Sequence, residues 1–126
     1  MPAAFDRCRQ THKEAAYLAG FIDGDGCILM YKTRGQWIVR VDITQKNKLL
    51  LERLQEIWGG FITNGIRAWH LNFQGEKARQ VLEIVVRYGK LKVDEAGLGL
   101  LFLDDKKNYP ENLALQMRQI KEERYA

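Results

Sequence analysis

The sequence has 126 residues, of which 46% are hydrophobic, and a formal net charge of +4. A chain of this length and composition is expected to form one soluble globular domain with a core of its own. No positively charged leader followed by an apolar segment begins the chain, so we expect an intracellular protein that is not secreted. The two cysteines, Cys8 and Cys27, do not have a metal-binding spacing, and we assign them no chemistry.

The positive charge is concentrated in the middle of the chain. Residues 26–74 carry seven basic and three acidic side chains, whereas residues 75–126 carry ten and nine. A localised basic segment is expected of a phosphate-binding surface, although many ordinary proteins show a similar excess. The charge distribution alone is therefore weak evidence of nucleic-acid binding.

The first predicted element is a helix that follows a loose N-terminal arm of residues 1–10. Thr11 is its predicted N-cap, and Glu14 completes a capping box three residues later. The helix then continues into the stretch LAGFIDGDG, residues 18–26, where acidic residues and glycine end it.

One face of this helix is almost bare of side chains. Ala16, Gly20 and Gly24 recur every four residues and therefore lie on the same face. Glycine inside a helix costs about 1 kcal/mol relative to alanine, which close packing against a second helix would offset. The flank of the helix is expected to enter the protein's own core through its apolar residues, Leu18, Phe21 and Ile22.

Besides helix pairing, the stretch could form a transmembrane helix, a calcium loop or an ordinary acidic helix terminus. The apolar run is far below the roughly 18 residues that span a membrane and carries two carboxylates, which excludes a transmembrane helix. An EF-hand loop counted from Asp23 requires an oxygen ligand at its fifth position and Glu at its twelfth, but Cys27 and Arg34 occupy those positions. An ordinary acidic helix terminus stays open. Because the helix dipole opposes a carboxylate at the C-terminus, this placement favours a bound metal.

Residues 27–34 and 36–45 are predicted to form a hairpin around Gly35, because both are rich in β-branched and aromatic residues. The second strand alternates, and its expected core face holds Trp37, Val39, Val41 and Ile43. The opposite face is either an ordinary solvated surface or a surface that contacts base edges in a major groove. The candidate DNA-binding residues on this face of the hairpin come from both strands and the tip between them: Leu29, Tyr31, Thr33, Arg34, Gln36, Ile38, Arg40 and Asp42.

A second helix is predicted over residues 48–58, with Asn47 as its N-cap and a stop at Gly59-Gly60. Its buried face is expected to hold Leu50, Leu54, Ile57 and Trp58. A second hairpin then joins residues 61–64 to residues 67–73 through a tight turn at Asn64-Gly65. This hairpin adds three candidate DNA contacts, Thr63, Arg67 and His70, although His70 also fits a solvent-exposed histidine.

Three more helices complete the predicted chain, over residues 76–88, about 94–103 and 110–124. Gly97 and Gly99 lie inside the middle one, and the sequence gives no physical reason for them. The order helix, hairpin, helix, hairpin, helix, helix predicts an α+β domain with one antiparallel sheet and its helices on one face. Residues 105–126 form a C-terminal helical extension of this single domain.

The stretch LAGFIDGDG strongly resembles the signature of the LAGLIDADG homing endonucleases. The order of elements over residues 14–104 is also similar to the αββαββα core of that family. The resemblance implies a homing-endonuclease-like domain over residues 1–126, with a saddle-shaped antiparallel sheet that binds double-stranded DNA.

The resemblance also implies a set of catalytic residues. Asp25 matches the family's metal-binding carboxylate, Gln45 resembles the residue that orients active-site water, and Lys92 resembles the lysine near the scissile phosphates. Taken individually, Gln45 and Lys92 would be interpreted as surface residues. The chain departs from related homodimeric enzymes at Lys48 and Leu49, where those enzymes have an arginine shortly after the glutamine.

Because the chain holds one signature, the resemblance implies a homodimer joined through Ala16, Gly20 and Gly24. Each Asp25, with the carbonyl of Gly24 as a further ligand, would then hold Mg²⁺ or Mn²⁺ close to the two-fold axis. Magnesium is favoured because it uses few carboxylates and takes its other ligands from phosphate and water. The implied reaction is hydrolysis of both strands at a long palindromic or pseudo-palindromic site, with no membrane and no small-molecule cofactor involved.

Two further classes of function remain open. One is a non-cleaving DNA- or RNA-binding relative, such as an intron maturase or a regulator, and the presence of Asp25, Gln45 and Lys92 argues against it. The second is a protein-interaction domain, which is distinguished by whether the purified chain binds duplex DNA at all.

Overall fold

The computed structural model of the chain describes residues 9–106 and 109–124. Their elements are α1 (Arg9–Asp25), β1 (Gly26–Thr33), β2 (Gln36–Gln45), α2 (Lys48–Trp58), β3 (Phe61–Asn64), β4 (Trp69–Gln74), α3 (Gly75–Tyr88), α4 (Val93–Asp104) and α5 (Pro110–Arg124). The predicted loose arm lies almost wholly outside the described residues. Within these ranges no helix is both long enough and apolar enough to cross a membrane.

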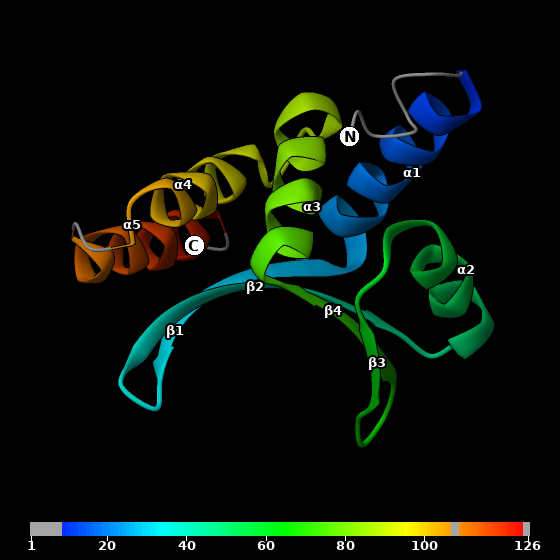
Figure 1. The fold of residues 1–126 in the computed structure, drawn as a ribbon, viewed down its shortest axis with the longest axis horizontal. Coiled ribbons are helices and arrows are strands. Elements are labelled where there is room, and N and C mark those ends of the chain that lie inside the picture. Colours follow the sequence, from blue (N-terminus) through cyan, green and yellow to red (C-terminus); the bar gives the residue numbers. More distant parts are fainter. Residues whose placement is uncertain (1–8, 107–108, 125–126) are drawn as a thin grey trace.

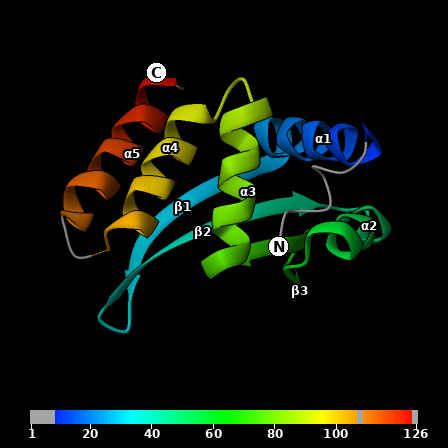
Figure 2. The same cartoon turned by 45° about the horizontal axis from the view of Figure 1, so that its top comes forward.

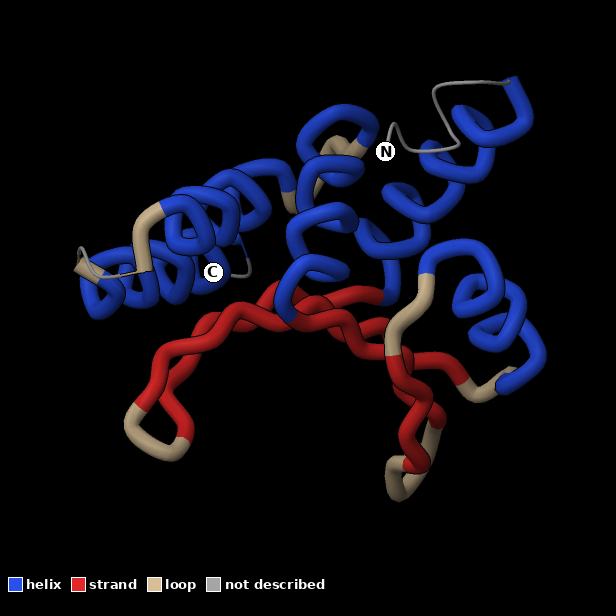
Figure 3. Tube along the Cα trace, in the orientation of Figure 1, coloured by secondary structure: helices blue, strands red, loops and turns tan. Residues whose placement is uncertain are grey.

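The strands form a four-stranded antiparallel sheet in the order β1-β2-β4-β3. The helices cover one face of this sheet, and the sheet arches so that both hairpin turns point away from them (Figures 1 and 3). Seen from above, α5, α4, α3 and α1 lie side by side across the sheet, and α2 lies at its far end (Figure 2). The predicted α+β class, with helices on one face, is therefore confirmed.

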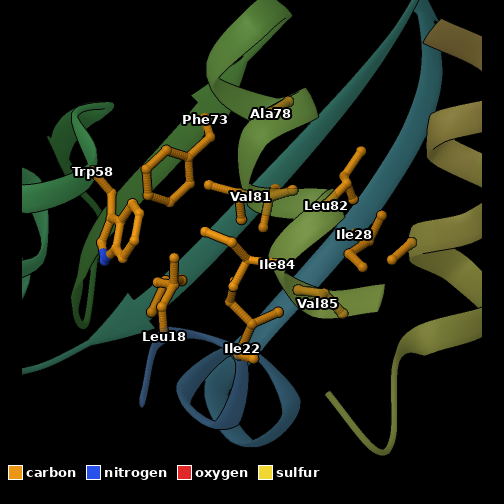
Figure 4. Close-up of a cluster of buried hydrophobic side chains, with 14 of the residues drawn as sticks. Leu18, Ile22, Ile28, Trp58, Phe73, Ala78, Val81, Leu82, Ile84 and Val85 are labelled. Carbon is orange, nitrogen blue, oxygen red and sulfur yellow. The ribbon is translucent and has the colours of Figure 1, made fainter. Parts of the chain in front are cut away.

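The core lies between the sheet and the helices. Strand alternation directs apolar side chains toward the helices, and Ile28, Val41, Ile43, Leu71 and Phe73 are fully buried there. The helices contribute further buried side chains, among them Leu18, Ile22, Val81, Leu82 and Val85 (Figure 4). Burying each large side chain of this kind stabilises the fold by about 1.5–3 kcal/mol, so the sheet's inner face fixes the register of both hairpins.

The start of α1 differs from the prediction. The helix already includes Arg9, so Thr11 lies inside it and is not the N-cap of a capping box. Arg9 and Gln10 are good helix formers, and they extend the helix beyond the residue that sequence signals indicated.

The buried face of α2 also differs from the prediction. Leu51, Leu54 and Trp58 are buried, whereas Leu50 is only half-buried and Ile57 is 47% exposed. The sequence offers three consecutive leucines at the start of this helix, so more than one face satisfies a helical period. Packing against β3 and β4 selects the face that begins at Leu51. The N-cap is confirmed, since Asn47 Oδ1 accepts a hydrogen bond from the Leu50 amide at 3.3 Å.

The two hairpins use different turns. Between β1 and β2, Arg34 and Gly35 both have positive φ, at 51° and 79°, which is typical of a tight two-residue turn. Between β3 and β4, the predicted tight turn at Asn64-Gly65 is wrong: Asn64 still pairs with Trp69, and residues 65–68 form the connection. A Cβ at Gly65 would lie 2.5 Å from His70 Nε2, so glycine here permits the approach of the His70 ring.

The structure explains one of the two glycines in α4. A Cβ at Gly99 would lie 2.9 Å from Leu82 Cδ1 and 3.2 Å from Val39 Cγ2. Glycine therefore lets α4 approach both α3 and the sheet. A Cβ at Gly97 would have no described atom within 4 Å beyond its chain neighbours and the backbone of its own helix, and that glycine lines an open apolar hollow.

Candidate active site and nucleic-acid interface

Two carboxylates lie at the C-terminal end of α1, and their surroundings differ. The Asp23 carboxylate accepts hydrogen bonds from the backbone amides of Lys90, at 2.7 Å, and Lys92, at 3.1 Å. It therefore ties the end of α1 to residues 89–92, the loop between α3 and α4. Asp25 is exposed at the last position of the helix. Asp25 is the carboxylate that can receive a ligand without breaking the fold.

Gln45, the last residue of β2, contacts Asp25 directly. Its Oε1 accepts hydrogen bonds from the backbone amides of Lys46, at 3.1 Å, and Asn47, at 3.4 Å. These bonds fix the orientation of the amide group, and its Nε2 donates to Asp25 Oδ2 at 3.3 Å. The pair is brought together because β1 leaves the end of α1 and pairs with β2, whose end returns to the same place.

Lys92 is buried rather than exposed, with 6% of its surface accessible. Its ammonium group donates to the carbonyl oxygens of Ile22, at 3.1 Å, and Asp23, at 2.6 Å. The last carbonyls of a helix have no partner within the helix, and a cation is favoured there by the helix dipole. The interpretation of Lys92 as a surface residue, taken alone, is therefore wrong. The side chain holds the turn of α1 that carries Gly24 and Asp25.

The donors at this site fit a magnesium-type ion with few protein ligands. In the described ranges no cluster of three or more His, Cys, Asp or Glu side chains could hold a metal. Asp25 offers one exposed carboxylate, and the carbonyl of Gly24 is one of the last four of α1, which have no partner within the helix. Magnesium is commonly bound by one or two carboxylates together with water and substrate phosphate. A zinc site would require more nitrogen or sulfur ligands than this position provides.

The bare face of α1 is exposed along its length. Ala16, Gly20 and Gly24 are all accessible, and a Cβ at either glycine would lie more than 4 Å from every described atom outside its chain neighbours and the backbone of α1. The opposite face is fully buried through Ala15, Leu18, Ala19 and Ile22. No contact within the described chain therefore requires glycine on the bare face.

The outer face of the sheet gathers the predicted strand contacts. Pairing places Leu29 opposite Arg40, Tyr31 opposite Ile38, and Thr33 opposite Gln36, so the two sets share one face. Thr33, Gln36 and Thr63 are exposed, and the exposed Arg34 and Arg67 lie in the two turns. The half-buried members are Leu29, Tyr31, Ile38, Arg40, Asp42 and His70.

Arg40 is held in place on this face. Its guanidinium carbon lies 5.6 Å from the centre of the Tyr31 ring, a cation–π arrangement. Its Nε is buried and has no hydrogen-bond partner among the described residues. The Tyr31 contact orients the guanidinium group, which suits Arg40 to bind an acceptor on this face of the sheet.

His70 links three strands of the outer face. Its Nδ1 lies 3.0 Å from Asp42 Oδ2 and 3.1 Å from Thr44 Oγ1, and Thr63 is its partner on β3. Asp42, Thr63 and His70 border a hollow of about 560 Å³ that Gln74 also lines. Gln74 was missed because the predicted strand stopped at Phe73. One further step of the alternation places Gln74 opposite Arg40.

Comparisons with known proteins agree with this architecture. A family model described as a LAGLIDADG-like domain matches residues 12–93. The fold is similar to that of the homing endonuclease I-CvuI in complex with its target, at 24% identity and a TM-score of 0.75, covering 86% of this chain and 82% of that one. It is also similar to the archaeal intron-encoded homing endonuclease I-Vdi141I complexed with DNA, at 18% identity and a TM-score of 0.74, covering 89% and 86%. No curated protein sequence matches the chain.

Proposed function

The chain belongs to the LAGLIDADG homing endonuclease family, and we propose that it is an active, homodimeric member that cleaves both strands of a long, palindromic or pseudo-palindromic DNA site. The observation that carries this proposal is the state of Asp25. Its carboxylate is exposed, is contacted by an oriented Gln45, and sits at the foot of a bare helix face. One of the structural neighbours named above is complexed with DNA and the other is in complex with its target, which supports DNA as the substrate.

The bare stripe of α1 supports the dimer. Two copies that pack Ala16, Gly20 and Gly24 against each other about a two-fold axis bring both Asp25 residues to the same end of the helix pair. Each copy would then act on one strand. The outer faces of the two sheets would lie on either side of the axis, so the preferred DNA site would be symmetric or nearly so.

Each residue of the site has a separate role in the proposed hydrolysis. Mg²⁺ or Mn²⁺ held by Asp25 and the Gly24 carbonyl would supply positive charge beside the scissile phosphate and a more acidic water. The Gln45 amide, fixed by two backbone donors, orients the Asp25 carboxylate and water next to it. Lys92 holds the last turn of α1 and adds positive charge close to the phosphate, where negative charge develops in the transition state.

The outer sheet face would supply recognition. Exposed Arg34 and Arg67 at the two turns suit phosphate contacts, which give affinity independent of sequence. Arg40 and the Asp42–His70 pair suit base contacts in the major groove, because their side chains are already oriented.

The decisive variant is Asp25→Asn. It removes the charge that retains the ion and nearly preserves the shape of the side chain, so we expect cleavage to fall by orders of magnitude while DNA binding persists or tightens. The target should be selected from a randomised duplex library by binding, so that its choice does not presuppose cleavage. Gel shift and cleavage are then measured on that target at matched salt with Mg²⁺ or Mn²⁺.

Asp23→Asn is the matched control, because it makes the same chemical change two positions away. It weakens two backbone hydrogen bonds, so it should lower the melting temperature, whereas Asp25→Asn should not. Normal cleavage by Asp25→Asn would refute the mechanism. A wild-type chain that binds its target but never cleaves it would favour the non-cleaving relative.

Arg40→Ala tests recognition separately. A base-contacting arginine contributes about 1–3 kcal/mol of discrimination, so its loss should relax base preference at symmetry-related positions of each half-site. Arg34→Ala is the comparison, and it should weaken all sequences alike. An unchanged preference profile in Arg40→Ala would assign Arg40 to phosphate contact.

A further inference from the structure

An ion pair between a buried Glu95 and a partly exposed Arg124 lies behind the loop that supports the candidate site. Glu95, in the first turn of α4, is completely inaccessible to solvent. Arg124, near the end of α5, contacts both of its oxygens: Nη1 donates to Oε2 at 2.6 Å and Nη2 donates to Oε1 at 2.5 Å. The pair joins the two C-terminal helices, which lie side by side (Figure 2).

Arg124 also contacts the supporting loop itself. Its Nη2 donates to the carbonyl of Leu91 at 2.9 Å. Leu91 lies between Lys90 and Lys92, whose amides bind Asp23. A continuous set of hydrogen bonds therefore runs from α5, through residues 89–92, to the last turn of α1.

The Glu95–Arg124 pair is better suited to fixing the orientation of neighbouring groups than to stabilising the fold. A buried ion pair often contributes no more stability than apolar side chains of similar volume, because removing both charges from water is costly. The planar guanidinium, in contrast, fixes direction, since it binds a carboxylate through two donors and still reaches a third acceptor. Lysine in its place would keep the charge and lose this geometry.

We propose that Arg124 and Glu95 are positioning residues for the active site: they hold residues 89–92 so that Lys92 keeps the last turn of α1, and with it Asp25, in place. This makes α5, which lies outside the family match over residues 12–93, a working part of the site. The effect on cleavage rests on the proposed function, but the effect on the loop does not.

Amide hydrogen exchange on the free protein tests the coupling without DNA. In Arg124→Lys, the amides of Lys90 and Lys92 should exchange about tenfold faster, because the loop opens more often, while those of the core helix α3 stay unchanged. Arg118→Ala is the matched control, since Arg118 is exposed on the same helix. Unchanged exchange at Lys90 and Lys92, or equally faster exchange throughout the chain, would overturn the proposal.

Single-turnover cleavage tests the consequence for the site. Arg124→Lys and Glu95→Gln should cleave about tenfold more slowly with an unchanged Kd for the target, because binding and positioning depend on different residues. Arg118→Ala should cleave at the wild-type rate.

The double variant Glu95→Met/Arg124→Leu separates positioning from stability. It replaces both charges with apolar groups, so it should melt at or above the wild-type temperature and still cleave slowly. Cleavage at the wild-type rate would overturn the proposal. If the wild-type protein does not cleave its target, the proposed function fails, and the exchange experiment alone decides whether the loop is held by this pair.

Discussion

Helices α1 and α4 each carry a pair of closely spaced glycines, but the surroundings of these glycines differ. In α4, a Cβ at Gly99 would lie 2.9 Å from Leu82 Cδ1, so packing within the chain requires the small residue. In α1, Gly20 and Gly24 have open space where a side chain would go. The packing of one copy thus accounts for Gly99 in α4 and leaves Gly20 and Gly24 in α1 unexplained.

The comparison of α1 with α4 shows which features, besides open space, make a helical glycine a candidate for an interface. Gly97 in α4 is also open, so space alone does not identify an interface. What distinguishes α1 is that Ala16, Gly20 and Gly24 form an unbroken exposed stripe that ends at Asp25. Each glycine in this stripe costs the helix about 1 kcal/mol relative to alanine. Packing of a partner against the stripe would offset this cost.

The largest effect is expected for Gly20→Leu. A bulky side chain on the stripe would separate the two copies of the proposed dimer, so the protein should be monomeric and the proposed cleavage should fall by orders of magnitude. The protomer should still fold, because a Cβ at Gly20 would lie more than 4 Å from every described atom outside its chain neighbours and the backbone of its own helix. Sedimentation velocity and thermal melting measure the two properties. A Gly20→Leu protein that stays dimeric and cleaves normally would show that the stripe is not the interface.

A smaller effect is expected for Gly99→Leu, which should destabilise the protomer itself rather than its association with a second copy. The side chain would be forced against Leu82 and Val39, and overpacking of this type costs about 1–3 kcal/mol. Urea unfolding measures the loss, which should appear in the protomer whether or not it pairs. If Gly99→Leu unfolds at the wild-type urea concentration, the contrast between the two helices is lost.

The smallest effect is expected for Gly97→Ala. Because the new methyl group would have no described atom within 4 Å beyond its chain neighbours and the backbone of its own helix, only helix propensity changes, and the fold should gain about 0.5–1 kcal/mol. The same urea experiment measures the gain. A destabilised Gly97→Ala protein would indicate that this glycine is also required by packing.

Local sequence patterns predicted the strands well, because a strand shows a two-residue alternation of apolar and polar side chains. This alternation is visible in the sequence without knowing which strands pair. The inward set Val39, Val41 and Ile43 is buried as expected, and the pairing of β1 with β2 follows from it. The Asn47 cap is equally local. The face of α2 was mistaken because consecutive leucines fit several helical phases, and only the sheet that α2 packs against selects one.

The candidate site was less accessible to sequence reasoning, because its geometry depends on distant segments. The motif contains two acidic residues, Asp23 and Asp25, and their different surroundings arise from hydrogen bonds to a loop 67 and 69 residues away. The burial of Lys92 has the same origin. Residue type indicated which groups could act, and tertiary structure separates the supporting groups from the available one.

The contact between α5 and β1 has a consequence for how copies of the chain associate. β1 is an outer strand of the sheet, and outer strands invite pairing with strands of other molecules, which leads to aggregation. Lys121 of α5 donates to the Ile28 carbonyl on that strand, placing a charged side chain where a foreign strand would dock. The other outer strand, β3, has only four residues and offers little to pair with. Self-association by extension of the sheet is thus disfavoured on both sides.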